Sequence, residues 1–230
     1  MDLKQKVTAS TQMRGAMIFE FFSPGIPIIL KNAGCEFIIF DMEHGGLSLE
    51  QFKTLATISN AHNIFPLIRI PEVSYNYVAR ALDLGASGVM APMINTPEDA
   101  LKIVNSSKYP PLGNRGAGFG FAHDNYISQN PLSYIEKANN SLINIIQIES
   151  KKALENVKEI ASIEGVDCLW VGHFDLTNFL GIPGDFTSEV YLNAINEIIK
   201  AAKSNNKSLG IMVNNKEEME TYSKLGFNMI

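Results

Sequence analysis

The chain has 230 residues, of which 46% are hydrophobic and 19% are charged, and its formal net charge is −5. This length suits one α/β barrel or open sheet with a large core, so we expect a single domain over residues 1–230. The acidic balance argues against a nucleic-acid or membrane-surface partner, and no apolar run approaches the roughly 20 residues that a membrane helix needs.

The two cysteines give a further indication of the environment in which the protein works. Cys35 and Cys168 lie beside or inside apolar runs, which is typical of buried free thiols in a reducing compartment. Residues 1–13 are mixed and polar, unlike a secretory leader. Together these features predict a soluble, cytoplasmic protein.

Apolar runs alternate with segments of helical periodicity along the whole chain. The predicted helices cover residues 1–10, 24–32, 48–62, 74–84, a segment starting at Thr96-Pro97, 131–140, 151–163, 188–204 and 216–225. The predicted strands cover residues 15–21, 37–40, 65–70, 88–93, 143–148, 168–171 and 208–213, with an eighth starting at 227–230. Because the strands are continuous apolar runs, they indicate a buried parallel sheet, and eight of them would close a (β/α)8 TIM barrel.

Two segments depart from this rhythm. The sequence stops inside the eighth strand, so we expect the C-terminal strand and helix to be truncated, or to be replaced by a neighbouring subunit. Residues 109–130 form a long, glycine-rich loop, which is typical of a functional or mobile segment. Its Gly116-x-Gly118-x-Gly120 spacing neither follows a strand nor opens a clear helix, which argues against a dinucleotide site.

Polar side chains gather where the predicted strands end. In parallel α/β proteins these carboxyl ends carry the chemistry. Residues two apart in a strand share a face, so Gln147 and Glu149 are expected to point the same way. In chain order the polar residues of this predicted rim are Asp41, Glu43, His44, Arg69, Gln147, Glu149 and Asp175.

Glu149 follows the apolar run Ile143–Ile148, where an unpaired carboxylate would be costly to bury. It needs a cation, and a metal ion and Arg69 are the two candidates. Glu149 and Asp175 together, with room for water, favour Mg²⁺ or Mn²⁺ over Zn²⁺. For Asp175, capping of a helix is the alternative interpretation.

His44 and Arg69 each have two interpretations as well. His44 is either an exposed loop residue or a general acid/base, since histidine titrates near neutral pH. Arg69 either forms a salt bridge with Asp41 or Glu43, or binds a carboxylate or a developing oxyanion. His173 is placed to line a pocket near Asp175.

Six short motifs occur in a characteristic order. They are Phe-Asp-Met-Glu-His-Gly (40–45), Leu-Ile-Arg (67–69), Leu-Asp-Leu-Gly-Ala (82–86), Tyr-Pro-Pro-Leu-Gly-Asn-Arg-Gly (109–116), Gln-Ile-Glu-Ser (147–150) and Val-Gly-His-Phe-Asp-Leu (171–176). In these motifs the chain resembles the HpcH/HpaI aldolase family of the phosphoenolpyruvate/pyruvate TIM-barrel superfamily. The resemblance implies a metal-dependent class II aldolase. Such an enzyme reversibly cleaves 4-hydroxy-2-oxo acids into pyruvate and an aldehyde through a metal-stabilised pyruvate enolate.

The resemblance also implies roles for individual residues. Glu149 and Asp175 would be the ligands of a divalent cation, Mg²⁺ or Mn²⁺ and in some cases Co²⁺. His44 would be the acid/base, Asp41 would support that site, and Asp83 would orient His44, if need be across a subunit interface of a homo-oligomer (a hexamer, a trimer of dimers). Substrate contacts would come from Arg69 at the keto oxygen, Gln147 beside the metal, and the backbone N–H groups around Gly172, His173 and Phe174 at the carboxylate.

Two departures from the family pattern bear on function. Many relatives have Pro-Ala where this chain has His173-Phe174, which implies a different pocket wall and substrate range. Relatives also continue past the eighth strand into a terminal helix, which in the family packs on a neighbouring subunit. Three alternatives remain open: an oxaloacetate decarboxylase, a CoA-ester lyase on the same barrel, and a non-catalytic truncated remnant.

Overall fold

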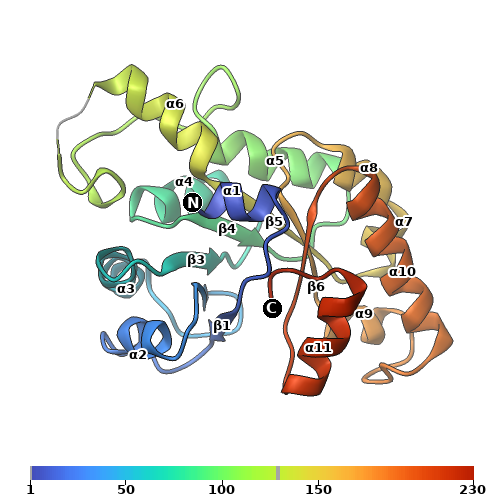
Figure 1. Ribbon diagram of the computed structural model, residues 1–230. Coiled ribbons are helices and arrows are strands. Elements are labelled where there is room, and N and C mark those ends of the chain that lie inside the picture. The colour runs from blue at the N-terminus through green and yellow to red at the C-terminus, as the bar shows by residue number, and fades with distance from the viewer. Residues whose placement is uncertain (1, 128–129) are drawn as a thin grey trace.

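The computed structural model describes residues 2–127 and 130–230. Residue 1 of the helix predicted over 1–10, and residues 128 and 129 of the loop predicted over 109–130, lie outside the described part. In that part, seven parallel strands in chain order form one curved sheet (Figure 1). They are β1 (Gly15–Ile18), β2 (Phe37–Asp41), β3 (Phe65–Arg69), β4 (Gly88–Ala91), β5 (Ile143–Ile148), β6 (Cys168–Val171) and β7 (Ser208–Ile211). The prediction of a parallel α/β sheet is confirmed.

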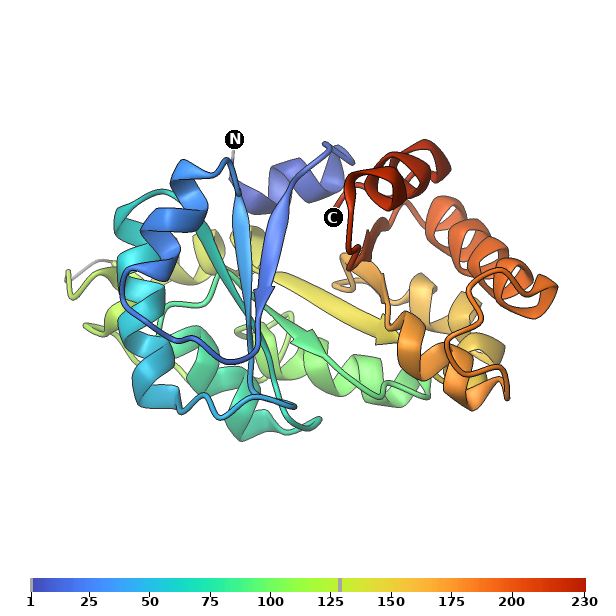
Figure 2. The same cartoon turned by 90° about the horizontal axis from the view of Figure 1, so that it is seen from below.

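Helices follow the strands and cover the outside of the sheet, with α2 and α3 at one side and α10 and α11 at the other (Figure 2). None of the described helices is long and apolar enough to span a membrane. The helices are α1 (Leu3–Thr8), α2 (Ile26–Asn32), α3 (Leu49–Ala61), α4 (Tyr75–Asp83), α5 (Pro97–Ser107), α6 (Pro131–Ser141), α7 (Lys151–Glu155), α8 (Val157–Ser162), α9 (His173–Phe179), α10 (Glu189–Ser204) and α11 (Lys216–Leu225), with a 3-10 turn at Ala122–Asp124.

Residues 228–230 connect the two outer strands of the sheet. The eighth strand predicted from residue 227 is reduced to isolated parallel bridges from Met229 to Met13 and Gly210. Around these bridges, the N–H of Met13 donates to the carbonyl oxygen of Asn228 over 2.7 Å, and the N–H of Ile211 donates to that of Met229 over 3.1 Å. The sheet therefore curves far enough for one short segment to contact both of its ends.

Alternating side chains divide the apolar core into two parts. One set faces the helices, and the other fills the inside of the curved sheet together with α1. The inner set includes Phe37 and Ile39 of β2, Leu67 of β3, and Ile143 and Ile145 of β5. Since residues two apart share a face, the same inward row continues into the polar residues at the carboxyl ends of these strands.

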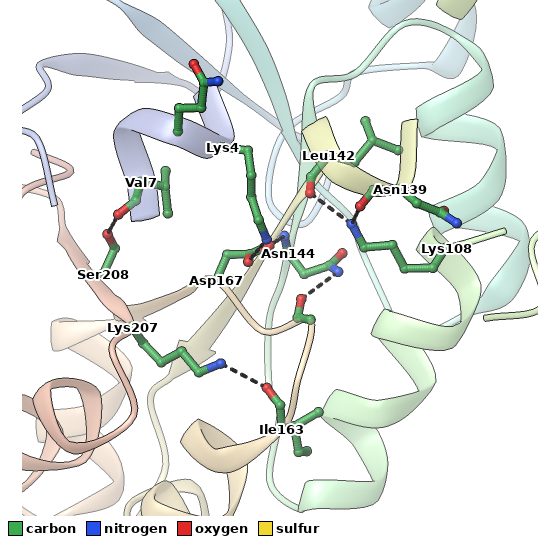
Figure 3. A network of polar contacts seen from close by, with 12 residues as sticks. Lys4, Val7, Lys108, Asn139, Leu142, Asn144, Ile163, Asp167, Lys207 and Ser208 are labelled. Carbon is green, nitrogen blue, oxygen red and sulfur yellow. Dashed lines mark hydrogen bonds and ion pairs between the residues drawn. The ribbon is translucent and has the colours of Figure 1, made fainter. Parts of the chain in front are cut away.

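A polar network holds the opposite, amino-terminal end of the sheet (Figure 3). Lys4 of α1 forms an ion pair with Asp167, which also accepts the backbone N–H of Asn144 over 2.8 Å. Ser208 of β7 donates to the carbonyl oxygen of Val7 over 2.7 Å. These contacts hold α1 across the starts of β5, β6 and β7. Helix α1 therefore covers the amino-terminal end of the sheet.

Several predicted boundaries are corrected by the structure. The strands predicted over 15–21, 88–93 and 208–213 end earlier, at Ile18, Ala91 and Ile211. The helix predicted over 151–163 consists of α7 and α8, which are separated at Asn156. Helix α9 was not predicted, because its seven residues carry no clear apolar period.

Candidate active site

A cavity of about 260 Å³ opens at the carboxyl ends of the strands. It brings together seven of the residues singled out from the sequence, which lie far apart along the chain. They are His44, Arg69, Gln147, Gly172, His173, Phe174 and Asp175. Asp41 and Glu149 contact this group from buried positions, whereas Asp83 lies elsewhere.

Asp41, the last residue of β2, organises the loop that follows it. Its side chain is fully buried, and its two oxygens accept the backbone N–H groups of Glu43, His44 and Gly45 at 3.2, 2.9 and 3.1 Å. Burial opposes ionisation of this carboxyl group, but the hydrogen bond and charge of Arg69 and the backbone donors outweigh it. The pKa of Asp41 therefore lies below its ordinary value, and the group is a carboxylate at neutral pH.

Arg69, the last residue of β3, is held by two acids and keeps one donor free. Its Nε donates to Oδ1 of Asp41 over 2.5 Å, and its Nη1 lies 2.9 Å from Oε2 of Glu43. The salt-bridge interpretation of Arg69 is thus confirmed for both acids. Its Nη2 is buried and has no hydrogen-bond partner among the described residues. Arg69 is also one of the residues that line the cavity.

Glu43 belongs to this site, although the sequence suggested no definite role for it. Its Oε2 lies between Nη1 of Arg69 and, at 3.7 Å, Nε2 of His44. Burial raises the pKa of Glu43, while the charges of Arg69 and His44 oppose that rise. Glu43 thus links the arginine to the histidine.

His44 is the most exposed polar residue of the site, with 59% of its side chain accessible. Its contact with Glu43 is too long for a hydrogen bond, so its ring is not held in one orientation by that residue. Asp83, predicted to orient His44, instead forms an ion pair with the buried Arg115 at 2.5 Å. Asp83 is thus engaged by Arg115 within this chain, and its role at His44, if need be across a subunit interface, stays a prediction.

Glu149 is a carboxyl group buried to 1% exposure. Its Oε1 accepts the backbone N–H of Met93 over 2.5 Å, and its Oε2 accepts Nε2 of Gln147 over 2.5 Å. Among the described residues no lysine or arginine forms an ion pair with it, so the pairing with Arg69 considered from the sequence is not formed. Burial raises the pKa of Glu149 to about 7, the N–H of Met93 opposes this, and the charges of Glu43 and Asp175 add to it.

Met93 is a residue that the sequence gave no reason to single out. It adopts φ 51°, a left-handed conformation that is unfavourable for a side chain of this size, and this conformation accompanies the hydrogen bond from its N–H to Glu149. The contribution comes from the backbone, so the residue type carries no signal of it.

Asp175 lies in the first turn of α9, two residues after the helix begins at His173. The N-cap of α9 is Gly172, so the capping interpretation of Asp175 is wrong. Gly172 packs against the other acid: a Cβ atom at this position would lie 2.4 Å from Oε2 of Glu149 and 2.8 Å from Nε2 of Gln147. The N–H of Gly172 donates to the carbonyl oxygen of Ile148 over 3.2 Å. Of the three backbone N–H groups predicted to bind the substrate carboxylate, those of His173 and Phe174 do not take part in this strand pairing.

The donor atoms fit a hard divalent cation that takes some of its ligands from water or substrate. Glu149 and Asp175 supply carboxylates, and Oε1 of Gln147 is buried without a hydrogen-bond partner in the described part of the chain. Oxygen donors of this kind suit Mg²⁺ or Mn²⁺. The described residues contain no group of three or more His, Cys, Asp or Glu that could hold a metal by itself.

Comparison with known protein families gives one match that covers nearly the whole chain. Residues 21–230 match the model of the family described as HpcH/HpaI aldolase/citrate lyase. The resemblance noted from the six sequence motifs is therefore confirmed.

Named relatives and solved structures agree with this match. The chain is 32% identical to 4-hydroxy-4-methyl-2-oxoglutarate aldolase cghB from Chaetomium globosum, over 85% of this chain and 74% of that protein. It is 31% identical to a hydroxypyruvate/pyruvate aldolase from Deinococcus radiodurans, over 88% of this chain and 73% of that protein. The crystal structure of an HpcH/HpaI aldolase from Desulfitobacterium hafniense superposes with a TM-score of 0.95 at 30% identity, covering 100% of this chain and 88% of that one.

Proposed function

The chain belongs to the HpcH/HpaI aldolase/citrate lyase family and is a carbon–carbon lyase, and on that premise we propose that it is a metal-dependent class II aldolase. Its substrates are 4-hydroxy-2-oxo acids, which it cleaves reversibly into pyruvate and an aldehyde. The (β/α)8 barrel and the single domain over residues 1–230 are part of this proposal.

Glu149 is the observation that carries the proposal. A carboxyl group that is 1% exposed, with a pKa raised by burial to about 7 and no ion pair in the described residues, is costly in a protein without a task for it. A divalent cation held by Glu149 and Asp175 removes that cost. When bound, such a cation acts as a Lewis acid for the negative charge that develops on the keto oxygen.

The remaining residues supply the other steps. Arg69, oriented by Asp41 and Glu43, presents its free Nη2 to the keto oxygen of the substrate and adds a second positive group there. His44 takes the proton of the 4-hydroxyl group while the C3–C4 bond breaks and its electrons pass to the pyruvate half. The aldehyde then leaves, and a proton delivered to C3 completes pyruvate.

Oxaloacetate decarboxylation is the second candidate. It requires the same charge stabilisation at the keto oxygen but no base for a 4-hydroxyl proton. The observation that favours it is the state of His44. Its side chain is 59% exposed, and Glu43, at 3.7 Å, is too far away to form a hydrogen bond with it. In this candidate, Arg69, Glu149 and Asp175 suffice.

A homo-oligomer, with a hexameric trimer of dimers as the expected form, completes the proposal. Asp83 is 35% exposed in its pair with Arg115, and among the described residues no carboxylate pairs with His44 more closely than Glu43 at 3.7 Å. A second subunit that brings Asp83 to His44 accounts for both features. Light scattering coupled to gel filtration measures the assembly, and a monomer with full aldolase activity would contradict this part.

The decisive experiment measures pyruvate release from racemic 4-hydroxy-2-oxopentanoate through coupled lactate dehydrogenase. The reaction is run with EDTA, Mg²⁺, Mn²⁺ or Co²⁺, on the wild type and on Glu149→Gln. Glu155→Gln, which changes an exposed acid on α7, is the matched control. We expect metal-dependent release that is lost only in Glu149→Gln. A folded wild type that releases no pyruvate with any of these metals would refute the aldolase.

A further inference from the structure

The cavity of the candidate active site has two chemically different walls. The polar wall comes from β2, β3 and β5 and carries His44, Arg69 and Gln147. The facing wall comes from β1, β6 and β7 and the residues that follow them. Besides His173 and Asp175, it carries the apolar side chains of Met17, Trp170, Met212 and Phe174. The proposed metal ligand Asp175 also follows β6, but the side chains of Met17, Trp170, Met212 and Phe174 take no part in the proposed metal and keto-oxygen contacts. These apolar side chains are therefore left for the other half of the substrate.

Phe174 is the most prominent side chain of the apolar wall. It remains 54% exposed although it lines the cavity. Its ring centroid lies 4.6 Å from that of His173 and 5.3 Å from that of Phe186, and Phe186 in turn packs on Tyr191. The ring is thus supported from behind by an aromatic cluster and presents its free apolar surface to whatever enters the cavity.

Lysine and arginine side chains are scarce in the described lining of the cavity. Arg69 is the one lysine or arginine among the described residues that line it, and two of its nitrogens are already engaged by Asp41 and Glu43. A substrate with a second carboxylate at its aldehyde end would therefore place that charge against Phe174, Met17 and Met212 without a partner. A carboxylate placed there would lose part of its hydration without gaining a partner, whereas an apolar tail would gain by covering the 54% exposed Phe174.

We propose that the aldehyde half of the substrate is apolar and uncharged, and that Phe174 is the residue that selects it. This inference rests on the proposed aldolase function and narrows its substrate class. It predicts different cleavage rates for two acids with the same carbon skeleton. They are 4-hydroxy-2-oxoheptanoate, which ends in a methyl group, and 4-hydroxy-2-oxoheptanedioate, which ends in a carboxylate.

The test compares kcat/KM for these two substrates with the same metal-loaded enzyme. The ratio does not depend on the fraction of active protein, so a partly unfolded variant still gives a valid reading. We expect the methyl-ended substrate to be preferred by about tenfold or more. Phe174→Ala lowers the ratio by about fivefold, mainly through a higher KM for the methyl-ended substrate. Phe179→Ala, which changes another half-exposed phenylalanine of α9 outside the cavity lining, keeps the wild-type ratio.

A second readout separates this inference from the aldolase proposal. Exchange of the C3 protons of pyruvate in D2O, followed by proton NMR, involves no aldehyde. Exchange together with equal or better cleavage of the dicarboxylate, or an unchanged ratio in Phe174→Ala, would overturn the inference and leave the aldolase standing. Absence of both exchange and cleavage would refute the aldolase and the inference together.

Discussion

Asp41 and Arg69 are register partners at the carboxyl ends of two neighbouring parallel strands, and their side chains meet at 2.5 Å between Oδ1 and Nε. The same carboxylate accepts three backbone N–H groups of the loop that carries His44. One buried group therefore sets the position of the arginine and of the histidine loop together.

Replacement of the Asp41 carboxylate is expected to disturb both the position of Arg69 and the loop that carries His44. Asp41→Asn keeps the size of the side chain but leaves only one oxygen as acceptor, so Arg69 or the loop loses its partner. We expect unfolding free energy to fall by about 3 kcal/mol, as for a broken buried ion pair. We expect kcat/KM to fall about 100-fold through misplacement of the catalytic groups. Urea denaturation and the pyruvate assay measure the two effects, and Glu220→Gln, at a surface pair with Lys216, is expected to change neither.

Stability of the metal-free protein is expected to depend on pH through Glu149. Burial raises its pKa from 4.5 to about 7, so the folded state holds this proton more tightly than the unfolded state. Its contribution to stability is fully present below about pH 4.5 and is lost as the pH rises through about 7, by at most about 3 kcal/mol. Denaturation in EDTA at pH 5 to 8 should show this decline in the wild type and a flatter profile in Glu149→Gln. Parallel profiles for the two proteins would contradict the prediction.

Gly172 should be required for the close packing of Glu149 and Gln147 against the start of α9. In Gly172→Ala the new Cβ would lie 2.4 Å from Oε2 of Glu149, so this carboxylate and Gln147 must shift. We expect the rise in melting temperature on addition of Mn²⁺ to be reduced or lost, because a bound ligand stabilises only the state that binds it. Gly46→Ala is the control, since a Cβ there meets nothing within 4 Å. Equal Mn²⁺ stabilisation of wild type and Gly172→Ala would show that the contact has no role in metal binding.

Substitution of His44 should separate the two candidate reactions. The aldol cleavage needs a base for the 4-hydroxyl proton, whereas decarboxylation of oxaloacetate does not. In His44→Ala we expect pyruvate release from the hydroxy acid to fall by a factor of about 100 to 1,000, as for the loss of a general base. Loss of oxaloacetate decarboxylation should be much smaller. Both rates are measured by the same coupled assay, and an equal loss of both would show that His44 does not act as this base.

Much of the site followed from the periodicity of the strands. Continuous apolar runs identified β2 and β5, and alternation of side chains predicted that Gln147 and Glu149 point the same way, as the hydrogen bond between them shows. The predicted starts of two helices were equally reliable: Ser48 and Thr96 accept N–H groups at the starts of α3 and α5. These features are determined by residues close together in the sequence, and the pattern of apolar and capping residues is therefore sufficient to predict them.

The remaining features depend on contacts between distant segments. The left-handed backbone of Met93 accompanies its hydrogen bond to a carboxylate 56 residues later, and no residue pattern announces it. Asp83, expected to orient His44 if need be across a subunit interface, pairs in this chain with Arg115 from the glycine-rich loop, a partner that only the folded loop brings close. Helix α9 is stabilised by burial of Leu176 and Thr177 rather than by its own periodicity, so it too became apparent only in three dimensions.

The bridges that Met229 makes with Met13 and Gly210 have a consequence for the order of folding. Met13 and Met229 lie more than 200 residues apart in the sequence. Their pairing therefore carries a large loop-closure entropy, and we expect it to form slowly and late in folding. Until residues 228–230 arrive, β1 and β7 each expose a row of unpaired backbone donors and acceptors to other chains. Refolding is therefore expected to lose yield as protein concentration rises, through association of intermediates that are complete except for this last contact.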